Sequence, residues 1–274
     1  MNLPYRFEKI LYRFEKTLYA FGLRSARELP RPDFLGIGAQ KAGTTWLWAN
    51  LRSHPQLFLP ETKEIHFFDY DFYTTSLASY LTRFSGAGDR KAGEVTPAYG
   101  HLPVARIRFI RRVMPDVRLV LLLRHPADRA WSQAVMNLVK RPGRRPETVS
   151  DDDFIAHIRS PRSVRRGDYA AIIDSWSSVF GREQIYVGMF DRIATEPEAL
   201  LREIFDHIGV SSDGIRWDEF PLRERWNEGP FVPIPPRVAA VLDEMYAREI
   251  DVLRARFGVP TLWSRTPTAR AAPP

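Results

Sequence analysis

No cysteine occurs among the 274 residues of the sequence. Disulfide frameworks and zinc sites that use cysteine are therefore excluded. The absence also suits a reducing compartment, so we expect a cytoplasmic protein. No apolar run approaches the roughly 18 residues that a membrane-spanning helix needs, and the N-terminus lacks the basic and apolar regions of a secretory signal. We therefore expect neither a transmembrane helix nor a signal peptide.

Acidic residues are fewer than basic ones: 33 Asp and Glu stand against 40 Lys and Arg, which gives a formal net charge of +7. Such an excess favours anionic ligands, acidic polymers or membrane surfaces without choosing among them. Hydrophobic residues make up 44% of the sequence and aromatic residues 12%. This composition is rich enough for a sizeable core, and the length suits one large domain with appendages.

The N-terminal segment contains a seven-residue repeat. The letters YRFEK at residues 5–9 recur at residues 12–16, and a third copy starts at Tyr19. The apolar members of the repeat fall on one stripe of a predicted amphipathic helix, at Phe7, Leu11, Phe14, Leu18 and Phe21. Packing of this helix against its own domain is the favoured interpretation. Self-association through residues 3–21, or peripheral attachment to a membrane surface, are the alternatives.

Apolar and amphipathic segments alternate between residues 32 and 260. Short apolar segments predict strands at 34–38, 57–59, 117–123 and 184–190. Helices are predicted at 44–53, 103–113, 169–180, 196–208 and 236–257, with another that begins at Pro126. The alternation predicts one α/β domain with a central parallel sheet flanked by helices. Residues 1–31 precede it as the amphipathic helix and a linker, and residues 261–274 are expected to be a disordered tail.

The first predicted strand leads into a turn of small residues that opens a helix, Gly38-Ala39-Gln40-Lys41-Ala42-Gly43-Thr44-Thr45. Such a turn exposes backbone N–H groups, and the N-terminus of the helix adds the positive end of its dipole. Lys41 contributes a full positive charge, and the hydroxyls of Thr44 and Thr45 can donate hydrogen bonds. The segment therefore predicts an anion-binding loop on a P-loop-type sheet.

This loop departs from the loop that binds nucleoside triphosphates. Gly38 and Gly43 fit the spacing G-x-x-x-x-G-K-[ST], but Thr44 occupies the lysine position and the lysine stands at position 41. The strand at 117–123 is followed by Arg124, where a metal-dependent enzyme would place an aspartate for Mg²⁺. We therefore expect an anion bound without a metal. A metal-dependent P-loop kinase, and a non-catalytic module that binds nucleotides or acidic polymers, remain as alternatives. We expect no nucleic-acid partner.

Two segments resemble the sulfotransferases that use 3′-phosphoadenosine 5′-phosphosulfate (PAPS). The first resembles their 5′-phosphosulfate loop and consists of Gln40, Lys41, Ala42, Gly43, Thr44, Thr45 and Trp46. The second, at residues 122–132, resembles their 3′-phosphate motif. The resemblance implies that Arg124 and Ser132 bind the 3′-phosphate, that PAPS is the co-substrate and that adenosine 3′,5′-bisphosphate is the product. Tyr169 also lies in a family-like segment, and it is either near the nucleotide or part of the core.

A third segment, Lys63-Glu64-Ile65-His66-Phe67-Phe68-Asp69, resembles the Lys-Glu-x-His-Phe-Phe stretch of the heparan-sulfate-type branch. The resemblance implies that Glu64 is the base, that His66 positions groups or relays a proton, and that Lys41 assists the leaving phosphate. His66 as the base itself, as in the branch that sulfates small molecules, is the alternative. The acceptor implied is a hydroxyl of a carbohydrate or glycolipid, with an amine or a natural product as other options.

Three further segments are weaker candidates. Residues 93–99 resemble a segment that lines the acceptor cleft, in which Glu94 or Tyr99 would contact the acceptor or simply shape a loop. The basic loop at 140–146 is a candidate guide for an acidic polymer. Residues 223–229 loosely match a basic loop that closes over the cofactor.

Overall fold

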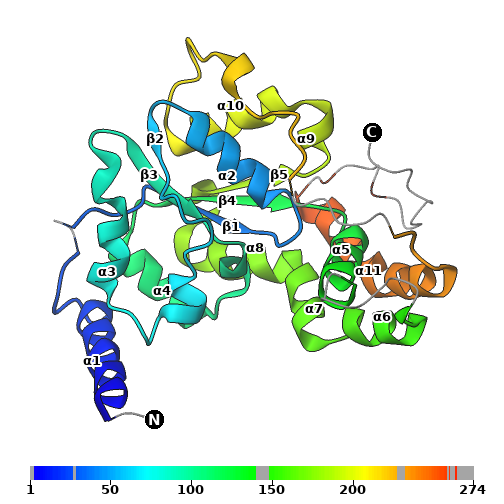
Figure 1. Cartoon of the computed structure of the whole chain (residues 1–274), viewed down its shortest axis with the longest axis horizontal. Coiled ribbons are helices and arrows are strands. Elements are labelled where there is room, and N and C mark those ends of the chain that lie inside the picture. The colour runs from blue at the N-terminus through cyan, green and yellow to red at the C-terminus, as the bar shows by residue number, and fades with distance from the viewer. Residues whose placement is uncertain are drawn as a thin grey trace.

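The computed structural model describes residues 3–26, 29–139, 148–226 and 232–257, with Val259 and Trp263, and only the backbone of residues 3–8. Its centre is a five-stranded parallel sheet in the order β2-β3-β1-β4-β5 (Figure 1). The strands are β1 Phe34–Gly38, β2 Leu57–Phe58, β3 Lys91–Val95, β4 Arg118–Leu123 and β5 Ile185–Met189. The prediction of a parallel sheet flanked by helices is confirmed.

The apolar sequences of β1 and β4 explain their central position in the sheet. Every residue of β1 is buried, as is every residue of β4 except Arg118. Phe34 of β1 pairs with Gly93 on one side and with Arg118 on the other. A Cβ atom at Gly93 would stand only 2.3 Å from the Phe34 ring, so a glycine is needed for the strands to pair with this aromatic side chain between them.

Strand β3 was not predicted from the sequence, in which residues 93–99 resemble a cleft-lining segment. Gly93 and Glu94 have low strand propensity, so the local sequence gives no strand pattern. The segment is extended because β1 and β2 pair with its two edges. Four of its five residues are buried as a result.

Three groups of helices surround the sheet (Figure 1). One face is covered by α2 Thr44–Ser53, α9 Arg192–Thr195 and α10 Pro197–Ile208, and the other by α4 Val104–Val113 and α8 Tyr169–Phe180. A third group packs together beside the sheet: α5 Pro126–Leu138, α6 Asp151–Ile158, α7 Pro161–Gly167 and α11 Pro236–Phe257. The shorter elements are α3 Leu77–Leu81, η1 Phe67–Asp71, η2 Thr82–Ala87, η3 Pro97–His101, η5 Arg182–Gln184 and η6 Trp217–Glu219.

Helix α1 Leu3–Ala20 projects from one corner of the molecule (Figure 1). It contacts the domain through buried Tyr19 and Lys16, whose Nζ donates to the backbone oxygen of Thr75 over 2.6 Å. The predicted apolar stripe does not make this contact, because Phe14 and Phe21 are exposed. The favoured interpretation, in which the helix packs on its own domain, is confirmed by its contact with α4, but Phe14 and Phe21 take no part in that packing. Phe7 lies outside the described side chains.

The C-terminal tail is anchored to the domain at one residue. The tail expected to be disordered contains Trp263, which is 1% exposed and donates from Nε1 to Asp191 over 2.9 Å. An indole ring with a polar partner is a strong anchor, so this part of the expectation is wrong. The rest of the tail, apart from Trp263, and the predicted basic loop at 140–146 lie outside the described residues. Among described helices, none is long and apolar enough to cross a membrane.

Candidate active site

The loop between β1 and α2 has the geometry of an anion cradle. Lys41 and Gly43 both have positive φ, at 67° and 79°. A Cβ atom at Gly43 would stand 2.4 Å from Ile193 and 3.1 Å from Phe190, so this turn needs glycine for both conformation and space. No side chain caps the N-terminus of α2 at Gly43. A helix N-terminus without a side-chain cap is suited to an anion, because its N–H groups and the positive end of the helix dipole attract negative charge.

Arg124 lies directly behind this loop. It follows the last residue of β4, and its Nη1 donates to the backbone oxygen of Lys41 over 3.2 Å. The guanidinium carbon stands 4.7 Å from the centre of the Phe190 ring, and Nε is buried without a hydrogen-bond partner. Burial lowers the pKa of Arg124. A largely buried guanidinium with an unsatisfied donor is well suited to a phosphate ligand.

Ser132, the other predicted 3′-phosphate residue, and Tyr169, predicted to lie near the nucleotide or in the core, differ in their setting. Ser132 lies on α5, is half-buried, and its hydroxyl forms no hydrogen bond with a described residue. Tyr169, at the start of α8, is fully buried and donates to the backbone oxygen of Arg124 over 2.9 Å. Tyr169 therefore supports the backbone of Arg124 from within the core.

A buried hydrogen-bond network joins the anion loop to α7. Gln133 of α5 donates to Gln40 Oε1 over 3.1 Å and accepts from Arg129 Nη1 over 2.9 Å. Arg129 is fully buried, and its Nη2 donates to the backbone oxygen of Ser163 in α7 over 3.1 Å. Neither Arg129 nor Gln133 was predicted from the sequence. The one feature of the sequence that points to them is their position on the helix that contains Ser132 of the second motif.

The C-terminal segment also reaches the loop region. Trp46, in the first turn of α2, is buried and donates from Nε1 to the backbone oxygen of Leu222 over 2.9 Å. The candidate closing segment begins at the next residue, Arg223, and is described as far as Trp226. Residues 227–229 of this prediction lie outside the described residues.

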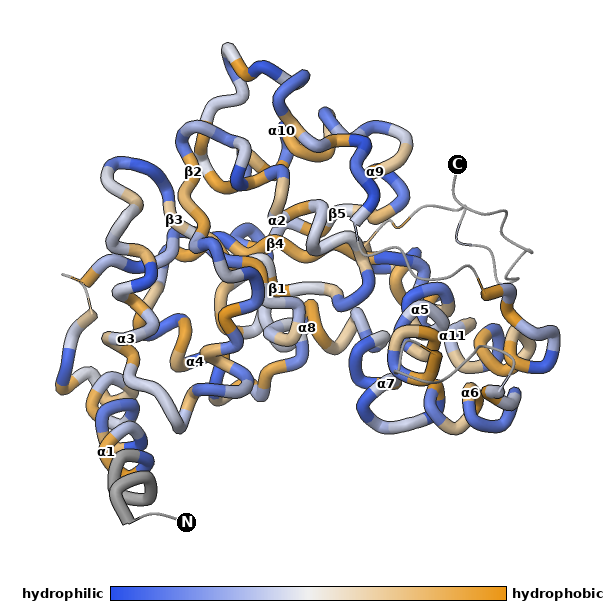
Figure 2. Tube along the Cα trace, in the orientation of Figure 1, coloured by the Kyte–Doolittle hydropathy of each residue, from blue (hydrophilic) through white to orange (hydrophobic). Residues whose placement is uncertain are grey.

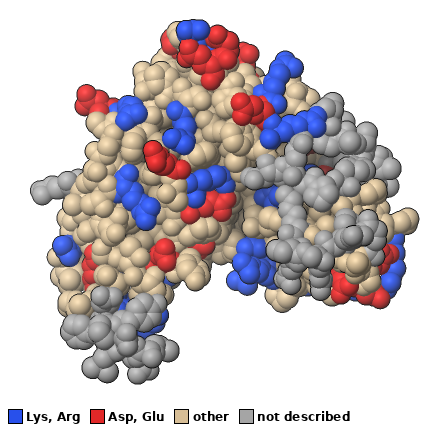
Figure 3. Space-filling view, viewed as in Figure 1, with Lys and Arg blue, Asp and Glu red and all other residues tan. Residues whose placement is uncertain are grey.

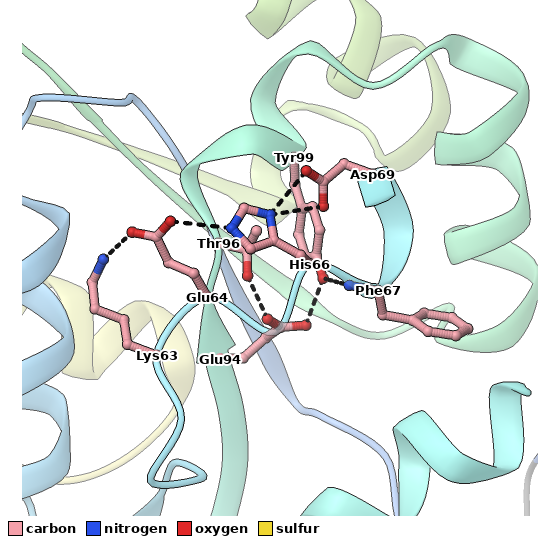
Figure 4. A network of polar contacts seen from close by, with 8 residues as sticks. All are labelled: Lys63, Glu64, His66, Phe67, Asp69, Glu94, Thr96 and Tyr99. Atoms are coloured by element: carbon pink, nitrogen blue, oxygen red, sulfur yellow. Dashed lines mark hydrogen bonds and ion pairs between the residues drawn. The ribbon is translucent and has the colours of Figure 1, made fainter. Parts of the chain in front are cut away.

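The third segment forms a compact polar group beside η1 (Figure 4). His66 Nε2 lies 3.3 Å from Glu64 Oε2, and His66 Nδ1 lies 2.9 Å from Asp69 Oδ2. Lys63 pairs with the other oxygen of Glu64. Glu64 is 36% exposed and His66 39%, so both are accessible to a ligand. Asp69 was not assigned a role from the sequence, although the spacing of three residues from His66 places it within reach across one turn.

A buried carboxylate holds this group in place. Glu94 is 2% exposed and accepts hydrogen bonds from Tyr80 over 2.8 Å, Thr96 over 2.7 Å and Tyr99 over 3.0 Å. Tyr99 in turn accepts from the backbone N–H of Phe67 over 3.1 Å, as Figure 4 shows. Burial raises the pKa of Glu94, and these hydrogen bonds act against the rise. Glu94 and Tyr99 are thus too deeply buried to contact an acceptor, and they shape the segment that carries Glu64 and His66.

Helix α7 forms a basic wall at the hollow that Figure 3 shows between the two sides of the molecule. Arg162 and Arg165 are exposed, whereas Arg166 is 8% exposed and its Nε has no hydrogen-bond partner. Burial, and then the charge of Arg166, lowers the pKa of His101 to about 4. Burial and the charge of Arg162 lower the pKa of Arg166 to about 10. The charge of Asp69 acts in the opposite direction on the pKa of both groups, so Asp69 lies near enough to affect them.

The polar groups follow neighbouring strands of one parallel sheet. Lys41 follows β1, Thr96 follows β3 and Arg124 follows β4, and these strands are adjacent in the order β3-β1-β4. The carboxyl ends of parallel strands meet at one edge, which is where open α/β sheets bind ligands. The fold and the loop after β1 thus define a P-loop-like α/β protein with a candidate anion site. A family model described as the sulfotransferase domain matches residues 31–223. The chain therefore belongs to the sulfotransferase family.

Curated relatives match only part of the chain. Membrane-associated sulfotransferase kil1 of Dictyostelium discoideum is 35% identical over 106 residues, which are 37% of this chain and 22% of that protein. Human heparan sulfate glucosamine 3-O-sulfotransferase 6 is 29% identical over 182 residues, which are 65% of this chain and 52% of that protein. The chain thus spans about half, or less, of the length of these relatives.

Solved structures match a larger share. A sulfotransferase from Alicyclobacillus acidocaldarius is 28% identical, with a TM-score of 0.67, over 85% of this chain and 98% of that one. Mouse sulfotransferase SULT7A1 complexed with PAP is 16% identical, with a TM-score of 0.54, over 88% of this chain and 93% of that one. The second match supports the fold alone.

Proposed function

We propose that this protein transfers the sulfuryl group of PAPS to an acceptor hydroxyl. The observation that carries the proposal is the contact between Arg124 and the backbone of Lys41, which brings two cationic groups to one anion loop. A co-substrate with a 5′-phosphosulfate and a 3′-phosphate needs two such groups close together. The arginine after β4 also stands where a kinase would place a magnesium ligand, which disfavours the kinase alternative.

The two ends of PAPS are assigned to different parts of this site. The 5′-phosphosulfate would bind the N–H groups of residues 40–45, the hydroxyls of Thr44 and Thr45, and Lys41. The 3′-phosphate would bind Arg124 and the unpaired hydroxyl of Ser132. Trp46 would flank the nucleotide, with its ring held by the hydrogen bond to Leu222.

In the transfer step the acceptor oxygen forms a bond to sulfur as the bond between sulfur and the bridging oxygen breaks. Adenosine 3′,5′-bisphosphate leaves, and Lys41 stabilises the negative charge on its 5′-phosphate. Glu64 takes the proton of the acceptor hydroxyl as the general base. His66, held between Glu64 and Asp69, orients the Glu64 carboxylate. The alternative, in which His66 is the base, uses the same geometry.

A carbohydrate or glycolipid is the acceptor class that we favour. The partial similarity to an enzyme named for heparan sulfate glucosamine supports a glycan hydroxyl. The exposed Arg162 and Arg165 of α7 suit an acceptor with carboxylate or sulfate groups. We propose a cytoplasmic location on the basis of the absence of cysteine.

Calorimetric titration tests the co-substrate. The protein, in buffer with EDTA, is titrated with adenosine 3′,5′-bisphosphate and separately with AMP. We expect the bisphosphate to bind at least about tenfold more tightly, because a charge-assisted phosphate contact contributes about 1.5–3 kcal/mol. Arg124→Ala removes this preference by weakening the bisphosphate alone.

Arg118→Ala is the matched control, because Arg118 is an exposed residue of the same strand. Its titrations should match those of the unchanged protein. Equal affinity for both nucleotides, or binding of ATP only when Mg²⁺ is added, would contradict the proposal and favour a kinase.

A further inference from the structure

Exposed apolar side chains gather at one end of the molecule. Among the described residues, the large apolar side chains that are well exposed are Ile10, Leu11, Phe14, Phe21, Leu23, Tyr70, Tyr73, Val164 and Trp226. The first seven belong to α1, the turn after it, and the segment that begins with η1. Figure 2 shows the apolar positions along α1, which projects into solvent. Phe14 is 61% exposed, Phe21 74% and Tyr70 81%. These side chains are therefore not part of the core, and together they form an exposed apolar patch.

Contacts of Lys16 and Glu15 attach α1 to the rest of the protein. Lys16 Nζ stands 5.3 Å from the centre of the Phe67 ring and 5.6 Å from that of Phe72, and it pairs with Glu15. Glu15 also accepts a hydrogen bond from the backbone N–H of Leu77 over 3.1 Å. The helix is thus attached by its polar side, and its apolar side points away from the domain. Such an orientation is the reverse of the usual amphipathic surface helix.

Positive charge accompanies the exposed apolar side chains. Arg13 lies 5.0 Å from the ring of exposed Tyr73, and Arg24 follows in the turn after α1. Arg112 of the neighbouring helix α4 lies against Gly22 in that turn. Glu15 is the one acidic residue among the described side chains of α1, and it faces the domain. On α1 and the turn after it, the surface therefore combines apolar side chains with an excess of cations, whereas η1 adds Asp69 and Asp71 beside Tyr70.

We propose that this surface docks onto a lipid bilayer that carries anionic headgroups. Phe14 and Phe21 would enter the interface, the tyrosines would lie at headgroup depth, and Arg13 and Arg24 would meet the lipid phosphates. A second copy of the chain is a poorer occupant, because a two-fold interface would place the same cations opposite each other. Docking would bring η1, and with it Asp69, next to the membrane. The proposal does not depend on the sulfotransferase reaction.

Co-flotation of the full chain with vesicles tests this surface. Phosphatidylcholine vesicles are compared with vesicles in which about 30% of the lipid is phosphatidylglycerol. We expect binding to the anionic vesicles that is weaker in high salt. Phe14→Ser and Phe21→Ser should each weaken it about tenfold, because burial of each ring is lost. Arg13→Gln should weaken binding to the anionic vesicles more than to the neutral ones.

Val164→Ser is the matched control, since Val164 is an exposed apolar residue outside this surface, and it should bind vesicles like the unchanged protein. Thermal unfolding of each variant verifies that it is folded. The proposal would be overturned if the unchanged protein did not bind vesicles, or if the Phe14→Ser and Phe21→Ser variants bound them as tightly as the unchanged protein does. A dimer in sedimentation equilibrium that Phe14→Ser dissociates, without vesicle binding, would assign the surface to a second copy instead.

Discussion

Three residues at the candidate site have an unusual backbone conformation. Lys41, Glu64 and His66 have φ values of 67°, 62° and 56°, and within the described part of the chain no other non-glycine residue has positive φ. The left-handed conformation is unfavourable for a residue with a side chain, by about 1–2 kcal/mol. Such residues concentrate where function requires a fixed side-chain direction. The same three residues are those to which the proposed reaction assigns chemistry.

Replacement of Glu64 tests its role as the base. With an acceptor found by screening charged and neutral glycans, Glu64→Gln should lower kcat about 10²–10⁴-fold, because proton transfer in the transition state is lost. The KM for PAPS should stay unchanged. His66→Asn should have a smaller effect if His66 only orients the carboxylate. Steady-state release of adenosine 3′,5′-bisphosphate is the measurement.

Glu61→Gln is a suitable control, because Glu61 is an exposed carboxylate of the same loop. Its kinetics should match those of the unchanged protein. A larger loss of kcat for His66→Asn than for Glu64→Gln would contradict the assignment and identify His66 as the base.

Site residues in short contiguous motifs could be predicted from the sequence, whereas those that meet only in space could not. Lys41, Arg124 and Glu64 each lie in a short motif, and their position within the motif is what marks them as candidates. Arg129 has the same appearance in sequence as a solvent-exposed helical arginine. Its burial follows from the packing of α5 against α7, which only the assembled fold creates.

The segment at residues 63–69 depends on η3 for its shape. Tyr99→Phe would remove the hydroxyl that accepts from the Phe67 N–H and donates to buried Glu94. Unsatisfied buried polar groups cost about 1–3 kcal/mol, so the free energy of unfolding should fall by about that amount. Urea denaturation measures it, and kcat should fall as well because Glu64 and His66 lose their support.

Tyr70→Phe provides the comparison, since the Tyr70 side chain is exposed. Its unfolding free energy should stay within about 0.5 kcal/mol of the unchanged value. Equal stability of the two variants would show that the Tyr99 hydroxyl does not support the segment.

Elements with their own periodicity were predicted nearly to the residue, and those that depend on neighbours were not. The apolar strand expected at 117–123 is observed at Arg118–Leu123, and the helix expected at 236–257 is observed at Pro236–Phe257. Strand β3 and the short helix η1 have no such periodicity. The buried Glu94 of β3 is stabilised by hydroxyls from other segments, which the local sequence of the strand does not reveal. The apolar stripe of α1 predicted the helix but not the side by which it attaches.

The stability of the whole molecule should depend on the protonation of His101. Burial and the α7 arginines lower its pKa to about 4 in the folded protein, against about 6.5 when unfolded. The unfolded state therefore binds more protons below pH 6.5, and stability is lost as the pH falls through this window toward 4. After allowance for partial exposure, the loss between pH 7 and pH 5 is about 1–2 kcal/mol. Urea denaturation at both pH values measures it.

His101→Asn isolates this contribution, because other groups titrate alike in both proteins. The variant should lose less stability than the unchanged protein over the same pH interval. An identical loss in the two proteins would contradict the depressed pKa.

The all-parallel sheet affects how the chain reaches its fold. Parallel strands cannot be joined by hairpins, so each strand must wait for a distant partner. Phe34 pairs with Gly93 and Arg118, and β4 is completed only by β5 at Ile185–Met189. During synthesis the apolar strand β1 leaves the ribosome well before either of its neighbours exists. Slow collapse and a demand for chaperones while the chain is still growing follow from this order of strands.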